Sequence, residues 1–242
     1  MSTKSLLPTK KSKPVANIKN AMILIYGAPG VGKSTLCASE ETALFVPTEP
    51  GLNHLEVYNA ASTIDKACFE TVSEIRDCFT ALKDSKHQFS PVVIDTVDKL
   101  YEIVLTHMKS KLDCEPGSDG WDKSGGWARS KALMTNIIMG FARLNSGLWL
   151  ISHTRDTIQK TRTGDKTYIT PALPPSACRM VCDLVDVIGY IEVDSEGKRT
   201  VRTKPNAHYV AKDRTRQGMP EELPLSYDAI TAAYTKAQKE KK

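Results

Sequence analysis

A glycine-rich segment near the amino end has the spacing of a phosphate-binding loop. Residues 27–34 read GAPGVGKS and match the pattern G-x-x-x-x-G-K-[ST]. Glycines are needed where a Cβ would obstruct a sharp turn that presents backbone N–H groups to phosphate oxygens. In this pattern the lysine reaches the β- and γ-phosphates, and the serine hydroxyl is a ligand of Mg²⁺. We therefore predict that ATP and Mg²⁺ bind at Gly27, Ala28, Pro29, Gly30, Val31, Gly32, Lys33, Ser34 and Thr35.

A carboxylate stands where a magnesium-binding aspartate is expected. Asp95 directly follows the apolar run PVVI at 91–94, which has the length of a buried strand. At the carboxyl end of a neighbouring strand, this carboxylate would hold Mg²⁺ together with Ser34. The alternative is a strand-end aspartate that caps the next helix. We favour the magnesium role because the phosphate-binding loop is present.

Hydrolysis of ATP needs a further group that orients and polarises the attacking water. The residue after Asp95 is Thr96, which cannot act as a base. Glu49 is the best candidate, because it lies just past the apolar run at 43–46, and a strand end there would bring it to the same sheet edge. Asp98 is a weaker competitor that belongs in the first turn of the next helix. The alternative for Glu49 is an ordinary loop glutamate.

His153 ends a further apolar run, LWLISH. At this edge of the sheet its side chain is placed to sense the γ-phosphate and to pass the signal to the polar loop that begins at Thr154. The alternative is a structural histidine at the end of a strand. We favour the sensor role because Lys33, Asp95 and Glu49 are expected at the same edge.

Alternating strands and helices are needed to bring these residues together. Four apolar runs have strand length, at 21–26, 43–46, 91–94 and 148–151. Helices are expected over 33–40, 71–86 and 97–112 and around the apolar stripe at 133–144. Thr71 and Glu74 have the spacing of a capping box. Strands that alternate with helices imply an α/β fold with a mainly parallel sheet and right-handed crossovers.

The chain changes character after His153. Residues 154–169 are polar and rich in threonine, which predicts a mobile loop, and 114–126 is a second expected loop. A short helix and a C-terminal β-meander should follow, before a last helix. We expect this helix at 176–185, the three strands of the meander at 186–193, 200–203 and 208–212, and the last helix from about 228.

Charge is concentrated at the two ends of the chain. The 242 residues hold 33 Lys+Arg and 28 Asp+Glu, a formal net charge of 33 − 28 = +5. Residues 1–20 contribute +5 and residues 236–242 contribute +3, so 21–235 sums to 5 − 5 − 3 = −3. The composition excludes collagen-like and wholly disordered chains. We expect a flexible basic arm at 1–20, a core at 21–226, and a C-terminal helix with a basic tail at 227–242.

Cysteine usage and hydropathy indicate a reduced protein outside the membrane. None of the six cysteines forms a CxxC pair. Cys178 and Cys182 are four residues apart, which favours two neighbours on one helix face over a pair of zinc ligands. No run of about 18 apolar residues is present. We therefore expect a cytoplasmic location and no membrane partner.

Four segments resemble strands of the RecA-core ATPases. Residues 45–49 (FVPTE) look like the strand that ends in the catalytic glutamate, and 92–95 (VVID) like the strand of the magnesium-binding aspartate. Residues 150–153 (LISH) resemble the strand that ends in a glutamine or histidine, and 211–214 (AKDR) the late strand with basic residues. The resemblance covers about 21–220 and is nearest to short phage-encoded RecA-like ATPases of single-strand annealing and recombination. It implies a RecA-like P-loop NTPase fold and a bacterial host cytoplasm.

The resemblance also implies contacts with single-stranded DNA and with other copies of the chain. The loop at 154–169 would contact DNA, and 114–126, with Trp121 and Trp127 nearby, would be a second loop that faces the central axis of the assembly. Lys212 and Arg214 would reach the ATP of a neighbouring subunit in a homo-oligomeric ring or filament. The alternative for both loops is a solvated surface. The residues implied in DNA binding are Arg155, Lys160, Arg162, Lys166 and Tyr168.

These inferences converge on a Mg²⁺-dependent ATPase, stimulated by single-stranded DNA, that supports annealing or strand exchange. A single-strand binding protein is a further candidate partner. Pro47 departs from the resemblance, because relatives often carry an aspartate at that position. Two alternatives stay open: a nucleotide or nucleoside kinase, which needs an acceptor pocket and a lid, and an ATP-switched loader of a replicative helicase.

Overall fold

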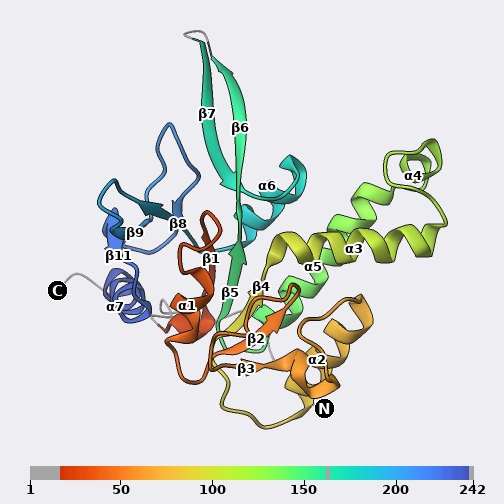
Figure 1. Cartoon of the computed structure of the whole chain (residues 1–242), viewed down its shortest axis with the longest axis horizontal. Coiled ribbons are helices and arrows are strands. Elements are labelled where there is room, and N and C mark those ends of the chain that lie inside the picture. Colours follow the sequence, from red (N-terminus) through yellow and green to blue (C-terminus); the bar gives the residue numbers. More distant parts are fainter. Residues whose placement is uncertain (1–16, 162–163, 240–242) are drawn as a thin grey trace, which may run out of the picture.

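The centre of the molecule is a mainly parallel sheet, seen nearly edge-on in Figure 1. The computed structural model describes residues 17–161 and 164–239. The predicted basic arm up to residue 16, Arg162 and the last three residues of the predicted tail lie outside this part. Within it, nine strands form the sheet: β1 (Met22–Tyr26), β2 (Leu44–Pro47), β3 (Tyr58–Asn59), β4 (Val92–Asp95), β5 (Leu148–Ser152), β8 (Val187–Val193), β9 (Arg199–Arg202), β10 (Lys212–Asp213) and β11 (Glu222–Pro224).

The strand order is β11-β9-β8-β1-β5-β4-β2-β3, with β10 paired to β8. Strands β8, β1, β5, β4 and β2 run parallel, so their carboxyl ends meet at one edge. Strand β5 lies between β1 and β4. The expectation that the strand of Asp95 directly neighbours the strand of the glycine-rich loop is therefore wrong, because one strand separates them. The α/β, mainly parallel fold is confirmed.

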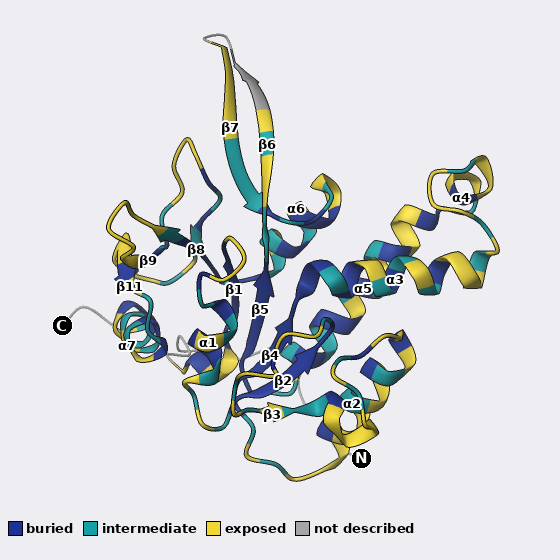
Figure 2. Cartoon of the chain, in the orientation of Figure 1, coloured by how far each residue is buried: buried dark blue, intermediate teal, exposed yellow. Residues whose placement is uncertain are grey.

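Helices cover both faces of the sheet, as Figure 1 shows. One face packs against α2 (Val72–Asp84), α3 (Val97–Leu112), α5 (Gly126–Ala142) and α6 (Pro175–Leu184). The other packs against α1 (Lys33–Ala38) and α7 (Tyr227–Gln238). Successive residues of a strand point to opposite faces, so Leu24 and Leu150 join the first core while Ile23 and Trp149 join the second. Burial on both faces explains why the central strands read as continuous apolar runs. Figure 2 shows them buried over most of their length.

Helix starts follow the capping signals in the sequence. Thr71 and Glu74 form the predicted capping box at the start of α2. Thr96 accepts a hydrogen bond from Lys99 N at the start of α3, whose bounds are those predicted. The expected loop at 114–126 is partly wrong, because it contains the short helix α4 (Asp119–Lys123). Trp121 in α4 is fully buried, so its side chain is not presented to a DNA strand.

The predicted mobile loop at 154–169 is a β-hairpin. Strands β6 (Thr154–Thr161) and β7 (Gly164–Pro171) pair antiparallel, and together they project beyond the carboxyl edge of the main sheet (Figure 1). Threonines and other β-branched or aromatic residues recur along both strands and favour extended backbone. Most described side chains toward the tip are exposed, Ile158 among them (Figure 2). The polar composition of this segment, which predicted a loop, therefore reflects a hairpin whose two faces are both exposed to solvent over most of their length.

The C-terminal meander is confirmed, but its third strand differs from the prediction. Strands β8 and β9 pair antiparallel around a turn in which Asp194 Oδ1 accepts hydrogen bonds from two backbone N–H groups. The next partner of β9 is β11, not the segment at 208–212, of which only Lys212 lies in a strand.

Two features are absent from the described residues. No helix there is long and apolar enough to span a membrane, and no group of three or more histidine, cysteine or carboxylate side chains could hold a metal.

Candidate active site

The glycine-rich loop joins the buried strand β1 to the start of α1. Gly32 caps α1 with φ 97°, a left-handed conformation that favours glycine. At Gly27 a Cβ would lie 2.9 Å from Val31 Cγ2 and 3.1 Å from Ile191 Cβ, so a larger residue would clash with the loop and with β8. The predicted spacing of glycines is thus required by local geometry.

Lys33 points back over this loop. Its ammonium donates hydrogen bonds to the carbonyl oxygens of Gly27 (3.1 Å) and Ala28 (2.9 Å), and the residue is buried. Burial lowers the pKa of Lys33, and the negative charges of Asp95, Asp98 and Glu49 oppose this shift. The ammonium is therefore fixed where the loop would bind phosphates, in reach of three carboxylates.

Asp95 and Ser34 meet across the intervening strand β5. Ser34 Oγ donates a 2.6 Å hydrogen bond to Asp95 Oδ2. Asp95 is 5% exposed, and burial raises its pKa, against the hydrogen bond from Ser34 and the charge of Lys33. A hydroxyl and a carboxylate oxygen that converge beside a phosphate-binding loop suit Mg²⁺, which prefers oxygen ligands. The two predicted metal residues therefore fit this ion.

Glu49 reaches the same edge because the ends of β2 and β4 are tied together. Thr48 N donates to Asp95 O (2.7 Å), and Thr48 Oγ1 donates to Thr96 O (2.6 Å). Pro47 lies in β2 in register with Asp95, so the departure at this position leaves the strand intact. The side chain of Glu49 is a quarter exposed, and partial burial raises its pKa. It is accessible to water at the edge where the loop ends.

His153 lies between two carboxylates. Its Nε2 is 3.5 Å from Glu49 Oε1, and its Nδ1 donates to Asp98 Oδ2 at 2.9 Å. The hydrogen bond with Asp98 raises the pKa of His153. Burial alone would raise the pKa of Asp98, but the hydrogen bond and charge of His153 outweigh burial and lower it. Glu49, His153 and Asp98 therefore form a chain of charged contacts.

The role of Asp98 was missed by sequence reasoning, which weighed it only as a substitute for Glu49. It is buried, and its Oδ1 also accepts a hydrogen bond from the backbone N–H of His153 (3.3 Å). The available signal was its place in the first turn of α3, directly behind the strand end of Asp95. Which side chain it would contact depends on the neighbouring β5, which the local sequence does not show.

The hairpin begins at the residue after His153. Ala172 N, just past β7, donates to His153 O (2.9 Å) and to Ser152 Oγ (3.1 Å). Both ends of the hairpin are thus attached to the end of β5. A movement of His153 would act directly on the base of the hairpin.

The predicted DNA-binding residues are distributed along this hairpin. In the ladder Arg155 is opposite Thr170, Thr157 is opposite Tyr168, and Gln159 is opposite Lys166. Residues opposite one another share a face, and every second residue of a strand returns to it. Arg155, Tyr168 and Lys166 therefore lie on one face. Arg155 and Lys166 are exposed and Tyr168 is half-buried. The backbone of Lys160 lies in β6 opposite Asp165, and Arg162 is outside the described residues.

Lys212 and Arg214 lie at the end of α6 rather than at the glycine-rich loop. Lys212 Nζ donates to the carbonyl oxygens of Cys182 (2.6 Å) and Val185 (2.7 Å), and Arg214 Nη2 donates to Asp183 O (2.8 Å). Both cations cap the negative end of this helix. A contact with the ATP of a neighbouring subunit stays a prediction, because the structure holds a single chain.

Two observations define a P-loop NTPase with an α/β, RecA-like fold. One strand, β5, separates the strand of the glycine-rich loop from the strand of Asp95. At the edge where these strands end, four side chains converge: Lys33, Ser34, Asp95 and Glu49. A family model described as an AAA domain matches residues 19–215, and the chain belongs to this family of P-loop ATPases. No curated protein matches the sequence.

Proposed function

We propose that this ATPase uses Mg²⁺ and acts on single-stranded DNA through the β6–β7 hairpin, in annealing or strand exchange. One observation carries the proposal. His153 contacts the candidate base Glu49 with one ring nitrogen, and the hairpin begins at the next residue. A movement of Glu49 at the γ-phosphate position can therefore reach the hairpin through a single residue, His153. The hairpin surface carries cationic and aromatic side chains.

The roles of the residues follow from their positions. Mg²⁺, when bound, neutralises phosphate charge. Lys33 adds a positive charge at the β- and γ-phosphates, while Ser34 and Asp95 supply oxygen ligands. Glu49 accepts a hydrogen bond from the attacking water and orients it. Its raised pKa makes it a stronger base than an exposed glutamate.

His153 holds Glu49 in place and reports on it. With Nδ1 bound to Asp98, the imidazole presents Nε2 to Glu49. When Glu49 turns toward the water, this contact weakens, and His153, still bonded to Asp98 through its ring and its backbone N–H, shifts at the end of β5. The shift passes to both strands of the hairpin, because Ala172 N is bonded to His153 O.

DNA contact is proposed for the face that carries Arg155, Lys166 and Tyr168. The two cations would pair with phosphates, and the tyrosine ring would stack on a base. If several copies of the chain bind along one DNA strand, their individually weak contacts add up to a higher total affinity. The homo-oligomer and a partner single-strand binding protein belong to this proposal.

The test is ATP hydrolysis with and without single-stranded DNA at several salt concentrations. We expect DNA to stimulate hydrolysis, and salt to weaken the stimulation steeply because phosphate contacts release counterions. Lys33→Ala should abolish hydrolysis, and Glu49→Gln should retain ATP binding while turnover falls by about 10²–10⁴-fold. Normal turnover by Glu49→Gln would show that another group is the base.

The DNA surface is tested with Arg155→Ala and Lys166→Ala combined. This double variant should keep DNA-independent hydrolysis and lose stimulation. Lys83→Ala with Lys86→Ala removes two exposed lysines at the end of α2, outside both segments implied in DNA contact, and serves as the matched control. Equal loss in both pairs, or phosphate transfer that needs a small acceptor, would contradict the proposal; the second result would favour a kinase.

A further inference from the structure

The guanidinium of Arg199 lies against the glycine-rich loop and has no acidic partner. A Cβ placed on Gly32 would be 3.2 Å from Arg199 Nη1, so the guanidinium approaches the loop at the position where a glycine leaves room. Arg199 is exposed, and within the described residues its side chain makes no ion pair and no hydrogen bond. An unpaired cation beside a phosphate-binding loop is placed to contact a bound nucleotide.

The pairing of β8 with β9 brings Arg199 to this place. Arg199 is the first residue of β9 and is opposite Val193, the last residue of β8. Strand β8 runs parallel to β1, so Arg199 lies at the edge of the sheet where the loop begins. Alternation along β9 puts Arg199 on the face of Val201, which packs in the core covered by α1 and α7. The side chain of Arg199 therefore lies on the same face of the sheet as α1.

Leu225 adds an apolar surface beside this cation. It directly follows β11, and its Cδ2 would be 3.4 Å from the same Cβ on Gly32. Leu225 packs against the core on this face and is partly exposed. An aliphatic side chain offers nothing to a phosphate, whereas a planar base packs on apolar groups and stacks on a guanidinium. The pair thus suits a base better than a phosphate.

The strand order separates the two ends of the nucleotide site. Glu49, Asp95 and His153 follow β2, β4 and β5, which all lie on one side of β1. Arg199 and Leu225 belong to β9 and to the end of β11, on the other side of β1. The residues placed to act on the γ-phosphate therefore occupy one flank of the loop. The nucleoside, at the opposite end of the triphosphate, is left with the flank of Arg199 and Leu225.

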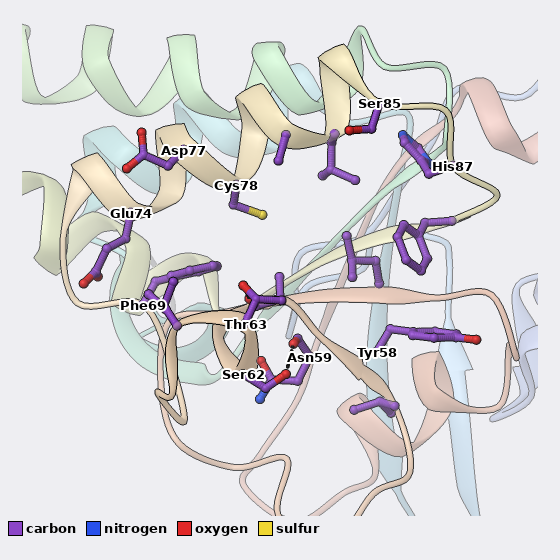
Figure 3. A pocket seen from close by; sticks show the side chains of 17 residues that line it. Tyr58, Asn59, Ser62, Thr63, Phe69, Glu74, Asp77, Cys78, Ser85 and His87 are labelled. Carbon is purple, nitrogen blue, oxygen red and sulfur yellow. Dashed lines mark hydrogen bonds between the residues drawn. The ribbon is translucent and has the colours of Figure 1, made fainter.

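A cavity of about 570 Å³ between α2 and the segment from β3 to the 3-10 helix at Ala60–Ile64 does not offer the base another place (Figure 3). Its lining is largely apolar but includes the carboxylates of Glu74 and Asp77, and the described residues that line it include no lysine or arginine. None of them belongs to the glycine-rich loop or to its two flanks. A nucleotide whose phosphates lie on the loop would not reach into this cavity.

We propose that Arg199 and Leu225 bind the base of ATP, with the guanidinium stacked on one face of the ring and the leucine packed against it. The class of ligand is a purine nucleoside triphosphate. This inference rests on ATP binding at the glycine-rich loop and does not depend on the proposed action on DNA.

Calorimetric titration of the full chain without DNA separates a contact with the base from a contact with phosphates. The two probes are ATP and inorganic tripolyphosphate, each with Mg²⁺, and the second has no base. Arg199→Ala should weaken ATP binding about 3–30-fold, the range expected for a cation–π contact. The same substitution should change the affinity for tripolyphosphate by less than about twofold. Leu225→Ala should also weaken the binding of ATP alone.

Two further variants control for charge. Arg199→Lys keeps the charge and removes the planar face, so it should restore ATP affinity only in part. Lys198→Ala removes the neighbouring exposed lysine, whose Nζ is 3.7 Å from Glu222 Oε1, and should bind ATP as the unsubstituted chain does. Circular dichroism checks that every variant is folded.

Two kinds of result would overturn the proposal. Equal losses for ATP and tripolyphosphate in Arg199→Ala, or full ATP affinity in Arg199→Lys, would assign the guanidinium to the phosphates. Unchanged ATP affinity in Arg199→Ala would show that Arg199 does not contact the nucleotide.

Discussion

Two carboxylates hold one imidazole at the end of β5, and this sets the charge of the site. His153 donates to Asp98 and faces Glu49, and its pKa is raised by the contact with Asp98. The stabilising contribution of a raised histidine pKa is full below the ordinary pKa of histidine and is lost as the pH rises through the raised value. For Asp98, with a lowered pKa, the contribution is present above the ordinary pKa of aspartate and is lost as the pH falls through the lowered value. Both contributions are therefore full between the ordinary pKa values of aspartate and histidine, about 3.9 and about 6.5.

Asp98→Asn should shift the pH dependence of DNA-stimulated hydrolysis to lower pH. Without the negative charge, the pKa of His153 falls, and the charged contact with Glu49 is lost at a lower pH. The measurements are the stimulated rate against pH and the NMR titration of the His153 ring. Glu102→Gln, which removes an exposed carboxylate from the same helix, is the control. An unchanged midpoint in Asp98→Asn would exclude this charge as the cause of the raised pKa.

At the residue scale, the sequence predicts which site residues lie at strand ends, but it does not predict which side chains they contact. Glu49, Asp95 and His153 each follow an apolar run, so parallel strands bring them to one edge whatever their neighbours are. The contact between Asp98 and His153 joins residues 55 positions apart, one in α3 and the other just after β5. It depends on how these two elements pack, which no local pattern encodes.

Elements with a core-facing stripe or a capping signal were predicted well. Helix α3 has the expected bounds because Thr96 caps it and its apolar residues recur at helical spacing. The sequence of the hairpin predicts a loop, because neither face joins the core over most of its length and no alternation of apolar and polar residues marks the strands. The segment at 208–212 was expected as a strand on composition, yet β11 fills that place in the meander.

Lys212→Met should lower the free energy of unfolding by about 1–2 kcal/mol. The substitution keeps the aliphatic stem and removes the ammonium that caps three carbonyl oxygens at the end of α6. Chemical denaturation measures the effect. Lys198→Met, at an exposed side chain on the meander, is the control and should change stability by less than about 0.5 kcal/mol. Unchanged stability with lost hydrolysis would instead support a role at the ATP of a neighbouring subunit.

At the scale of the whole molecule, the positive charge belongs to the ends of the chain. Residues 21–235 sum to −3, so DNA contact cannot depend on a uniformly basic body. Composition predicted this distribution. It could not show that the hairpin gathers Arg155 and Lys166 on one face, because that follows from the register of the pairing.

Deleting residues 1–16 should leave the affinity for single-stranded DNA and its dependence on salt unchanged. These residues hold four lysines, but the proposed DNA contact is made by the hairpin face that carries Arg155 and Lys166. Fluorescence anisotropy with labelled single-stranded DNA at several salt concentrations measures both quantities. A slope of log K against log salt that becomes shallower by roughly 0.7 per lysine lost would assign these cations to DNA instead.

The hairpin has the geometry of a lever, because its base is bonded to Ser152 and His153 beside the candidate active site. Each strand has eight residues, and a strand of that length extends roughly 26 Å. A rotation of about 10° at the base would therefore sweep the tip through roughly 4–5 Å, more than the roughly 3.4 Å between successive bases of one strand. A displacement at the base that leaves the pairing of the main sheet intact would thus move the far end of the hairpin by about the spacing between two successive bases.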